Sequence, residues 1–169
     1  MGLKEVLINL NDLKTKGIID DYAIGGGYAV MFYDIPLTTY DLDVLVTLPT
    51  ENDYRKLYEH FRSKGTKIED VYIFIEDMSV QFLPNYISPL FNSAIEEAIV
   101  VDFDGIRSRF VSVEYLILLL LTSFRVKDRL RIQGLLDKAN KELLLSLIQR
   151  FDDDENTLHK RYKEILAGT

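Results

Sequence analysis

Cysteine is absent from the 169-residue chain, and histidine occurs only twice, as His60 and His159. A chain without cysteine cannot build a disulfide scaffold, a thiolate zinc site or a thiol nucleophile. Two histidines far apart in the sequence also give a histidine-based zinc hydrolase little to build on, and we expect both to be ordinary helix residues. The lack of cysteine fits a reducing compartment, so we expect a cytoplasmic protein.

Long apolar runs are missing as well. The most apolar stretch, residues 115–121, is seven residues long, whereas a helix that crosses a bilayer needs about 20. The N-terminal sequence MGLKE leads into polar residues and lacks the apolar segment of a signal peptide. We therefore expect a buried core helix at 115–121 and no association with a membrane.

The balance of charge is acidic, with a formal net charge of −7. Such a chain repels phosphate backbones on average, so broad non-specific binding of nucleic acid is not expected. Apolar residues make up 47% and charged residues 28% of the chain, which is typical of a globular protein that folds around its own core. The length favours one compact unit.

Hydrophobic spacing and turn residues divide the chain into a mixed first part and a helical second part. Strands are predicted at residues 18–24, 41–48, 68–75, 79–83, 98–103 and 106–111. Helices are predicted at residues 4–16, 28–33, 54–61, 112–124, 126–138 and 140–151, and after the aspartates at 152–154. Residues 84–92 are predicted to be a loop. The fold class is therefore α+β: a mixed sheet flanked by helices in residues 1–111, with a helical segment, residues 112–169, packed on it.

Three consecutive glycines, Gly25, Gly26 and Gly27, fall between a predicted strand and a predicted helix. Glycines at such a junction let backbone N–H groups approach a phosphate closely. The segment is not a Walker loop, because no Gly-Lys-Ser/Thr follows it, and Val30 takes the place of the third glycine of a Rossmann fingerprint. On the glycines alone, a tight turn with close packing is an equal alternative.

Two aspartates, Asp41 and Asp43, begin the clearest predicted strand. Residues two apart on a strand share a face, so Leu42 and Val44 are expected to point the other way, into the core. Neighbouring carboxylates repel each other unless a cation neutralises them, and Mg²⁺ binds through one or two carboxylates plus substrate phosphates. The pair predicts a magnesium site; the alternative is an edge strand with solvated aspartates.

Together, GGYA at 26–29 and TYDLDV at 39–44 resemble the signature of the nucleotidyltransferase superfamily of the DNA polymerase beta type. The nearest branch is that of the AbiEii-type toxins and related bacterial nucleotidyltransferases. The resemblance covers roughly residues 20–135 and includes a helical segment with a Lys-Asp pair, here Lys127 and Asp128.

The resemblance implies a nucleotidyltransferase-like fold and a Mg²⁺-dependent activity. A nucleotidyl group would pass from a bound nucleoside triphosphate, such as ATP, to a hydroxyl of RNA, protein or a small molecule. The residues implied in catalysis are Asp41, Asp43 and Lys127, and the two aspartates would hold the metal. The residues implied in nucleotide binding are Gly25, Gly26, Gly27, Thr39, Lys127, Asp128 and Arg129.

Two positions depart from the family pattern. Leu37 stands where the family often has an arginine, and Gln81 stands where a third acidic residue is expected. A glutamine amide can accept a hydrogen bond, but it cannot take a proton from an acceptor hydroxyl. Asp77 could replace the missing acid only if the strand register differs.

Four cations, Arg125, Lys127, Arg129 and Arg131, lie within seven residues. A cationic helix beside an acidic metal site would suit a triphosphate, while a solvated helix face is the alternative for the three arginines. Three functions stay open on the sequence: an active nucleotidyltransferase, a catalytically degenerate module that binds a nucleotide or a partner protein, and the toxin-like member of a toxin–antitoxin pair.

Overall fold

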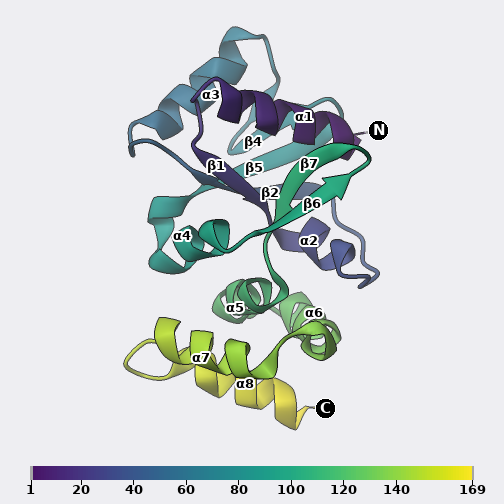
Figure 1. Ribbon diagram of the computed structural model, residues 1–169, viewed down its shortest axis with the longest axis vertical. Helices are drawn as coiled ribbons and strands as arrows, with labels where there is room; N and C mark the ends of the chain where they lie inside the picture. Colours follow the sequence, from purple (N-terminus) through teal and green to yellow (C-terminus); the bar gives the residue numbers. More distant parts are fainter. Residues whose placement is uncertain (1, 169) are drawn as a thin grey trace.

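The computed structural model describes residues 2–168, and this part of the chain forms one seven-stranded sheet and eight α-helices (Figure 1). The strands are β1 (Asp21–Ile24), β2 (Asp41–Thr47), β3 (Ile68–Glu69), β4 (Tyr72–Ile75), β5 (Met78–Pro84), β6 (Ile99–Phe103) and β7 (Ile106–Phe110). The α-helices are α1 (Gly2–Thr15), α2 (Gly26–Phe32), α3 (Asp53–Ser63), α4 (Pro89–Glu96), α5 (Val113–Ser123), α6 (Val126–Leu135), α7 (Lys141–Phe151) and α8 (Thr157–Ala167). Two short 3₁₀ helices are η1 (Asn85–Ile87) and η2 (Leu136–Lys138). The α+β class with helices at the C-terminal end is confirmed.

The strand order is β3-β4-β5-β2-β1-β7-β6, which puts β2 in the middle of the sheet. Strand β2 pairs with β5 in parallel and with β1 antiparallel, and β1 also pairs with β7 in parallel. The sheet is therefore mixed, as expected. Because β2 has a neighbour on each side, the alternative of an edge strand for Asp41 and Asp43 is wrong.

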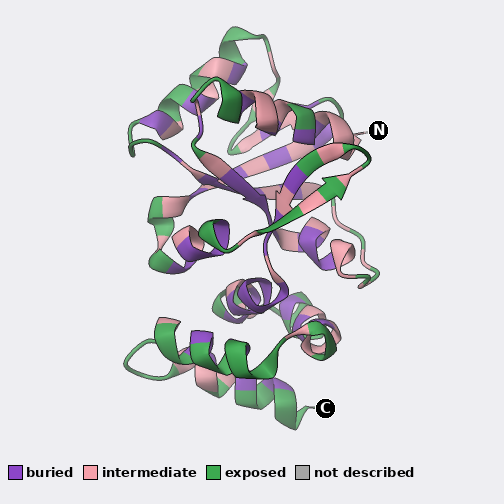
Figure 2. Ribbon diagram, in the orientation of Figure 1, coloured by how far each residue is buried: buried purple, intermediate pink, exposed green. Residues whose placement is uncertain are grey.

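The two faces of the sheet follow from the alternation along β2 and β5. Leu42, Val44 and Val80 are fully buried on one face, where α1 and α3 lie across the strands (Figures 1 and 2). Phe61 of α3 packs on Phe82 of β5 with 5.9 Å between the ring centroids. Helices α2 and α4 lie against the other face, with α5–α8 beyond them (Figure 1). Asp41 and Asp43 therefore face the side of the helical segment.

Helix α5 is buried on almost every side (Figure 2). Its residues Ile117, Leu118 and Leu121 have no exposed surface, which confirms the core helix expected at 115–121. Within residues 2–168, no helix has the combined length and apolar character that a membrane crossing requires.

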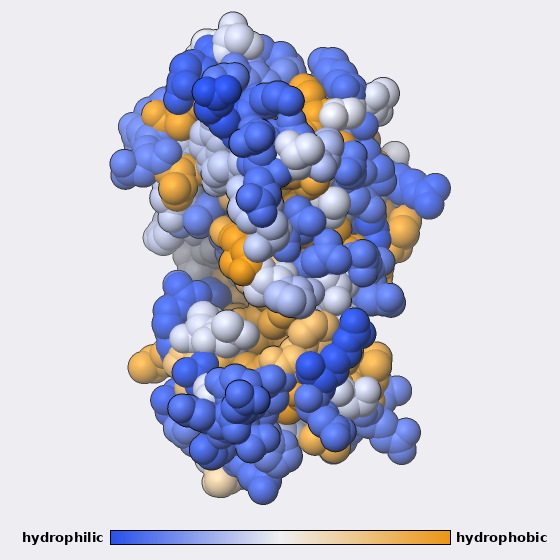
Figure 3. Space-filling model, turned by 90° about the vertical axis from the view of Figure 1, so that its left-hand side faces the viewer, coloured by the Kyte–Doolittle hydropathy of each residue, from blue (hydrophilic) through white to orange (hydrophobic). Residues whose placement is uncertain are grey.

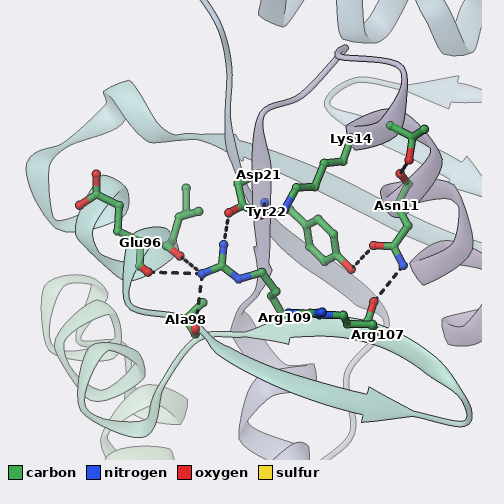
Figure 4. A network of polar contacts seen from close by, with 10 residues as sticks. Asn11, Lys14, Asp21, Tyr22, Glu96, Ala98, Arg107 and Arg109 are labelled. Carbon is green, nitrogen blue, oxygen red and sulfur yellow. Dashed lines mark hydrogen bonds and ion pairs between the residues drawn. The ribbon is translucent and has the colours of Figure 1, made fainter.

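Polar contacts of Arg109 and Asn11 join β1, β7, α1 and α4 (Figure 4). Arg109 forms an ion pair with Asp21 of β1, and its Nη2 donates to the carbonyl oxygen of Ile95 near the end of α4 at 2.9 Å. Asn11 of α1 accepts from Tyr22 Oη at 3.0 Å and donates to the carbonyl oxygen of Arg107 at 2.9 Å. These contacts fix β1, the strand that leads into the glycines.

Two local predictions were wrong. Residues 84–92 are not a loop: Ser88 Oγ accepts from the N–H of Phe91 at 3.3 Å and Pro89 occupies the first turn, so α4 begins there. The single strand expected at 68–75 is a hairpin, because Asp70 takes a left-handed conformation with φ of 52° and separates β3 from β4.

Candidate functional site

The glycine turn connects β1 to α2 directly beside Asp43. Gly26 has φ of +54°, and a Cβ on it would lie 2.8 Å from Cγ of Asp43. A Cβ on Gly27 would lie 2.8 Å from Cβ of Thr39, and one on Gly25 would lie 2.7 Å from Cδ1 of Leu45. Gly27 therefore needs glycine for space and Gly26 needs it for its backbone as well, whereas at Gly25 a Cβ would only displace the end of the Leu45 side chain.

The structure brings Asp41 and Asp43 to one half-buried face of β2, at the beginning of the strand. The register with β5 pairs Asp41 with Ser79 and Asp43 with Gln81. Paired residues on neighbouring strands point to the same side, so the four side chains form one polar group. Ser79 Oγ donates to Oδ1 of Asp41 and orients that carboxylate.

This register puts Gln81, and not Asp77, at the third position beside the two aspartates. Asp77 lies in the turn between β4 and β5. Tyr72 of β4 pairs with Gln81 from the other side. A neutral amide therefore completes the polar group on the sheet.

Burial raises the pKa of Asp43 above its ordinary value, and the charge of Asp41 raises it further. Arg125, Arg131 and Lys127 act in the opposite direction. The two carboxylates therefore repel each other, and the positive charges on α6 and on its N-cap residue Arg125 partly offset this repulsion. A bound divalent cation would relieve it further.

Helix α6 begins with a buried carboxylate that organises two arginines. Asp128 has no exposed surface and accepts from Arg125 Nε and Ser123 Oγ, both at 2.8 Å. Arg131 Nη1 lies 3.7 Å from its Oδ1. Burial alone would raise the pKa of Asp128, but the hydrogen bonds from Arg125 and Ser123 outweigh it and the pKa is lowered. Asp128 has no surface left for a nucleotide, so we assign it a positioning role in place of a direct contact.

The cations of α6 divide between two sides of the helix. Arg129 forms an ion pair with Glu164 of α8, with 2.6 Å between Nη1 and Oε1, and its guanidinium lies over the ring of Phe124. It therefore faces α8, away from Asp43. Lys127 is exposed and forms no ion pair within residues 2–168. It acts on Asp43 at a distance, and its contact with a phosphate stays a prediction.

Ser79 was not among the predicted site residues, and Arg125 and Arg131 were named only with the cationic helix, but all three belong to this constellation. Ser79 is two positions before Gln81, so the strand period could have identified it. Arg131, whose side chain is 14% exposed, could not be preferred over Arg129 from the sequence, because the packing of α8 decides which of them faces the sheet.

The donor set fits magnesium. Two carboxylates and an amide oxygen are hard ligands, the glycine turn lets the Asp43 carboxylate lie against its backbone at Gly26, and both residues line a cavity. Among residues 2–168, no group of three or more acidic, histidine or cysteine side chains could hold a metal ion alone. The residues present therefore suit a cation that also takes ligands from phosphates and water, as Mg²⁺ does.

No protein-family model matches the chain, and no curated protein matches it by sequence. Solved structures do match. A nucleotidyltransferase-like antigenic protein of Paracoccidioides brasiliensis is 14% identical with a TM-score of 0.60, over 94% of each chain. The antibiotic-resistance factor ANT(2'')-Ia in solution is 15% identical with a TM-score of 0.55, over 99% of this chain and 98% of its own. Its crystal structure in complex with adenylyl-2''-tobramycin is 16% identical with a TM-score of 0.54, over 94% of this chain and 98% of its own. The chain has a nucleotidyltransferase-like fold.

Proposed function

We propose that this protein is a Mg²⁺-dependent nucleotidyltransferase that binds a nucleoside triphosphate at Asp41 and Asp43. The observation that carries the proposal is the close packing of the Asp43 carboxylate, on the central strand, against the glycine turn at Gly26, beside a space that both residues line. That space faces the cations of α6. Acidic ligands, a glycine turn and cations around one space match the needs of a metal-bound triphosphate.

Each element of the site has a role in this proposal. Asp41 and Asp43 hold Mg²⁺, which neutralises phosphate charge and aligns the nucleotide when it is bound. The glycine turn admits phosphate oxygens to backbone N–H groups. Arg125, Lys127 and Arg131 stabilise the charge on the departing pyrophosphate.

The reaction forms a bond between an acceptor oxygen and the α-phosphorus and breaks the bond from that phosphorus to the bridging oxygen. Pyrophosphate leaves, and the acceptor proton passes to solvent. Gln81 can accept a hydrogen bond from the acceptor hydroxyl, but it cannot take the proton. Turnover is therefore expected to be slow. The ANT(2'')-Ia complex with adenylyl-2''-tobramycin supports a small-molecule hydroxyl as acceptor ahead of RNA or protein.

The sheet residues 1–111 and the helical residues 112–169 form one functional unit in this proposal. The acids lie on β2 and the cations on α6, so neither part carries a site without the other. The AbiEii-type branch, a toxin–antitoxin partner and a cytoplasmic location stay predictions from the sequence.

The second candidate function is a nucleotide-binding module without turnover, and Gln81 is the observation that favours it. Binding and turnover separate the two functions. We expect Mg²⁺-dependent binding of triphosphate in both cases, and slow release of pyrophosphate with small alcohols present only for the enzyme. Binding that is identical with and without Mg²⁺ would contradict both.

A further inference from the structure

A small apolar cavity begins at the Asp43 carboxylate. Its volume is about 220 Å³, and Gly26, Asp43 and Arg125 form its polar end. The rest of its wall is mainly apolar side chains from β2, β5, α4 and α5: Leu45, Leu83, Phe91, Leu116, Leu119 and Leu120. Figure 3 shows apolar atoms gathered in a hollow between the sheet part and the helical part of the molecule.

The polar groups at its rim are already engaged in the protein. Thr122 Oγ1 donates to the carbonyl oxygen of Leu118 at 3.0 Å, and Ser123 Oγ donates to Asp128 Oδ2 at 2.8 Å. Arg125 uses Nε on the same carboxylate oxygen at 2.8 Å. Its Nη2 also donates to Asp128 Oδ1 at 3.4 Å, and the guanidinium keeps a positive charge that suits a phosphate. The wall therefore offers contact area and few free directional donors.

We propose that this cavity holds the base of the bound nucleotide and does not read its hydrogen-bonding edge. The inference rests on the proposed function, because the base must lie one sugar away from a phosphate bound at Asp43. The volume is below the roughly 300 Å³ at which drug-sized sites begin, so the cavity suits a single ring system.

Weak selection among bases follows from such a wall. A site built around hydrogen bonds rejects the wrong partner by large factors, about 10⁴ or more, because its buried polar groups lose their partners. A hydrophobic wall discriminates only by size and contact area. We expect ATP, GTP, CTP and UTP to bind within about tenfold of one another, with the larger purines tighter because they bury more surface.

The test is calorimetric titration with the four nucleotides and with inorganic tripolyphosphate, each with Mg²⁺. Leu119 is half-buried in the wall, so Leu119→Trp fills the cavity. It should weaken every nucleotide at least about tenfold and leave tripolyphosphate within about twofold. Leu143→Trp on α7, at a site 45% exposed and outside the cavity, is the matched control and should change neither.

The outcomes distinguish failure of the base-binding inference from failure of the proposed function. If one nucleotide binds more than about 100-fold tighter than the others, the inference is overturned, because the protein must then recognise the hydrogen-bonding edge of the base. Unchanged nucleotide affinity in Leu119→Trp would overturn it too, and would leave the cavity to an apolar acceptor. If the wild-type protein does not bind tripolyphosphate with Mg²⁺, the proposed function is refuted instead. If Leu119→Trp fails to fold, Leu119→Ala should weaken nucleotides severalfold and spare tripolyphosphate; equal affinities would again overturn the inference.

Discussion

Gln81→Asp adds a third carboxylate to the polar group on the sheet. We expect it to lower the free energy of unfolding without magnesium and to raise it when magnesium is bound. The register pairs Gln81 with Asp43, and neighbouring strands lie about 5 Å apart. Two unit charges at that distance repel by about 3 kcal/mol at an effective dielectric of 20, and by about 1 kcal/mol in water. The site is half-buried, so the metal-free variant should lose about 1–3 kcal/mol of unfolding free energy at neutral pH.

The pH dependence of that loss has a definite sign. Like-charge repulsion raises the pKa of the carboxyl in the folded state above its value in the unfolded chain. An acid with a raised folded pKa destabilises the protein above the unfolded pKa, and the penalty disappears as pH falls below it. Metal-free Gln81→Asp should therefore approach wild-type stability near pH 4 and fall short of it at pH 7.

Magnesium should invert the result at neutral pH. A third oxygen ligand should increase the affinity for Mg²⁺. Because Mg²⁺ binds this site only in the folded state, the free energy of unfolding rises with its occupancy. The assay is urea denaturation at both pH values with and without Mg²⁺, together with pyrophosphate release. Gln81→Asn is the matched control, because it has the shape of aspartate without the charge.

The reasoning is refuted if Gln81→Asp and Gln81→Asn respond equally to Mg²⁺. It is also refuted if the aspartate variant shows no loss of stability at neutral pH without metal. Brisk turnover by the wild type would separately contradict the role given to Gln81, because the amide cannot act as a base.

Three further predictions test the rest of the site. Asp41→Asn should weaken Mg²⁺-dependent nucleotide binding about tenfold or more and should lower the pKa of Asp43 towards its ordinary value, because it removes a neighbouring charge; titration by NMR checks the pKa, and an unchanged metal response would exclude the pair as ligands. Gly26→Ala should destabilise the protein by about 1–2 kcal/mol from its left-handed backbone and also abolish metal-dependent binding; Gly65→Ala, where φ is +72° and nothing lies within 4 Å, should show only the first effect. Lys127→Ala should weaken triphosphate about tenfold and monophosphate less, measured by titration, whereas the exposed Lys163→Ala should change neither; equal losses for both ligands would place Lys127 away from the terminal phosphates.

Local patterns in the sequence were enough to predict the strand and the turn that carry the site. The period of two along β2 put Asp41 and Asp43 on one face, and the glycines marked the turn after β1. The capping pattern of Ser88 and Pro89 at the start of α4 was also present in the sequence. The loop predicted at 84–92 is wrong because this cap starts a helix at Pro89.

Other features depend on contacts between distant parts of the chain and leave no local trace. The central place of β2 depends on parallel pairing with β5, some 38 residues later. The choice between Arg129 and Arg131 depends on Glu164, 35 residues beyond Arg129. Hydrophobic spacing predicts an element, but it does not say which strand becomes its neighbour or which helix covers its exposed side.

Asp128 of α6 is fully buried, and its partners connect the helical part of the site to the sheet. A buried carboxylate without partners would be strongly destabilising, so its hydrogen bonds to Arg125 and Ser123 are obligatory. The same bonds hold Arg125, at the cap of α6, in the range where it lowers the pKa of Asp43. Ser123 ends α5, so the carboxylate also fixes the angle between α5 and α6. One buried charge thus positions a cation for the sheet and holds together the helices that form the apolar wall beside it.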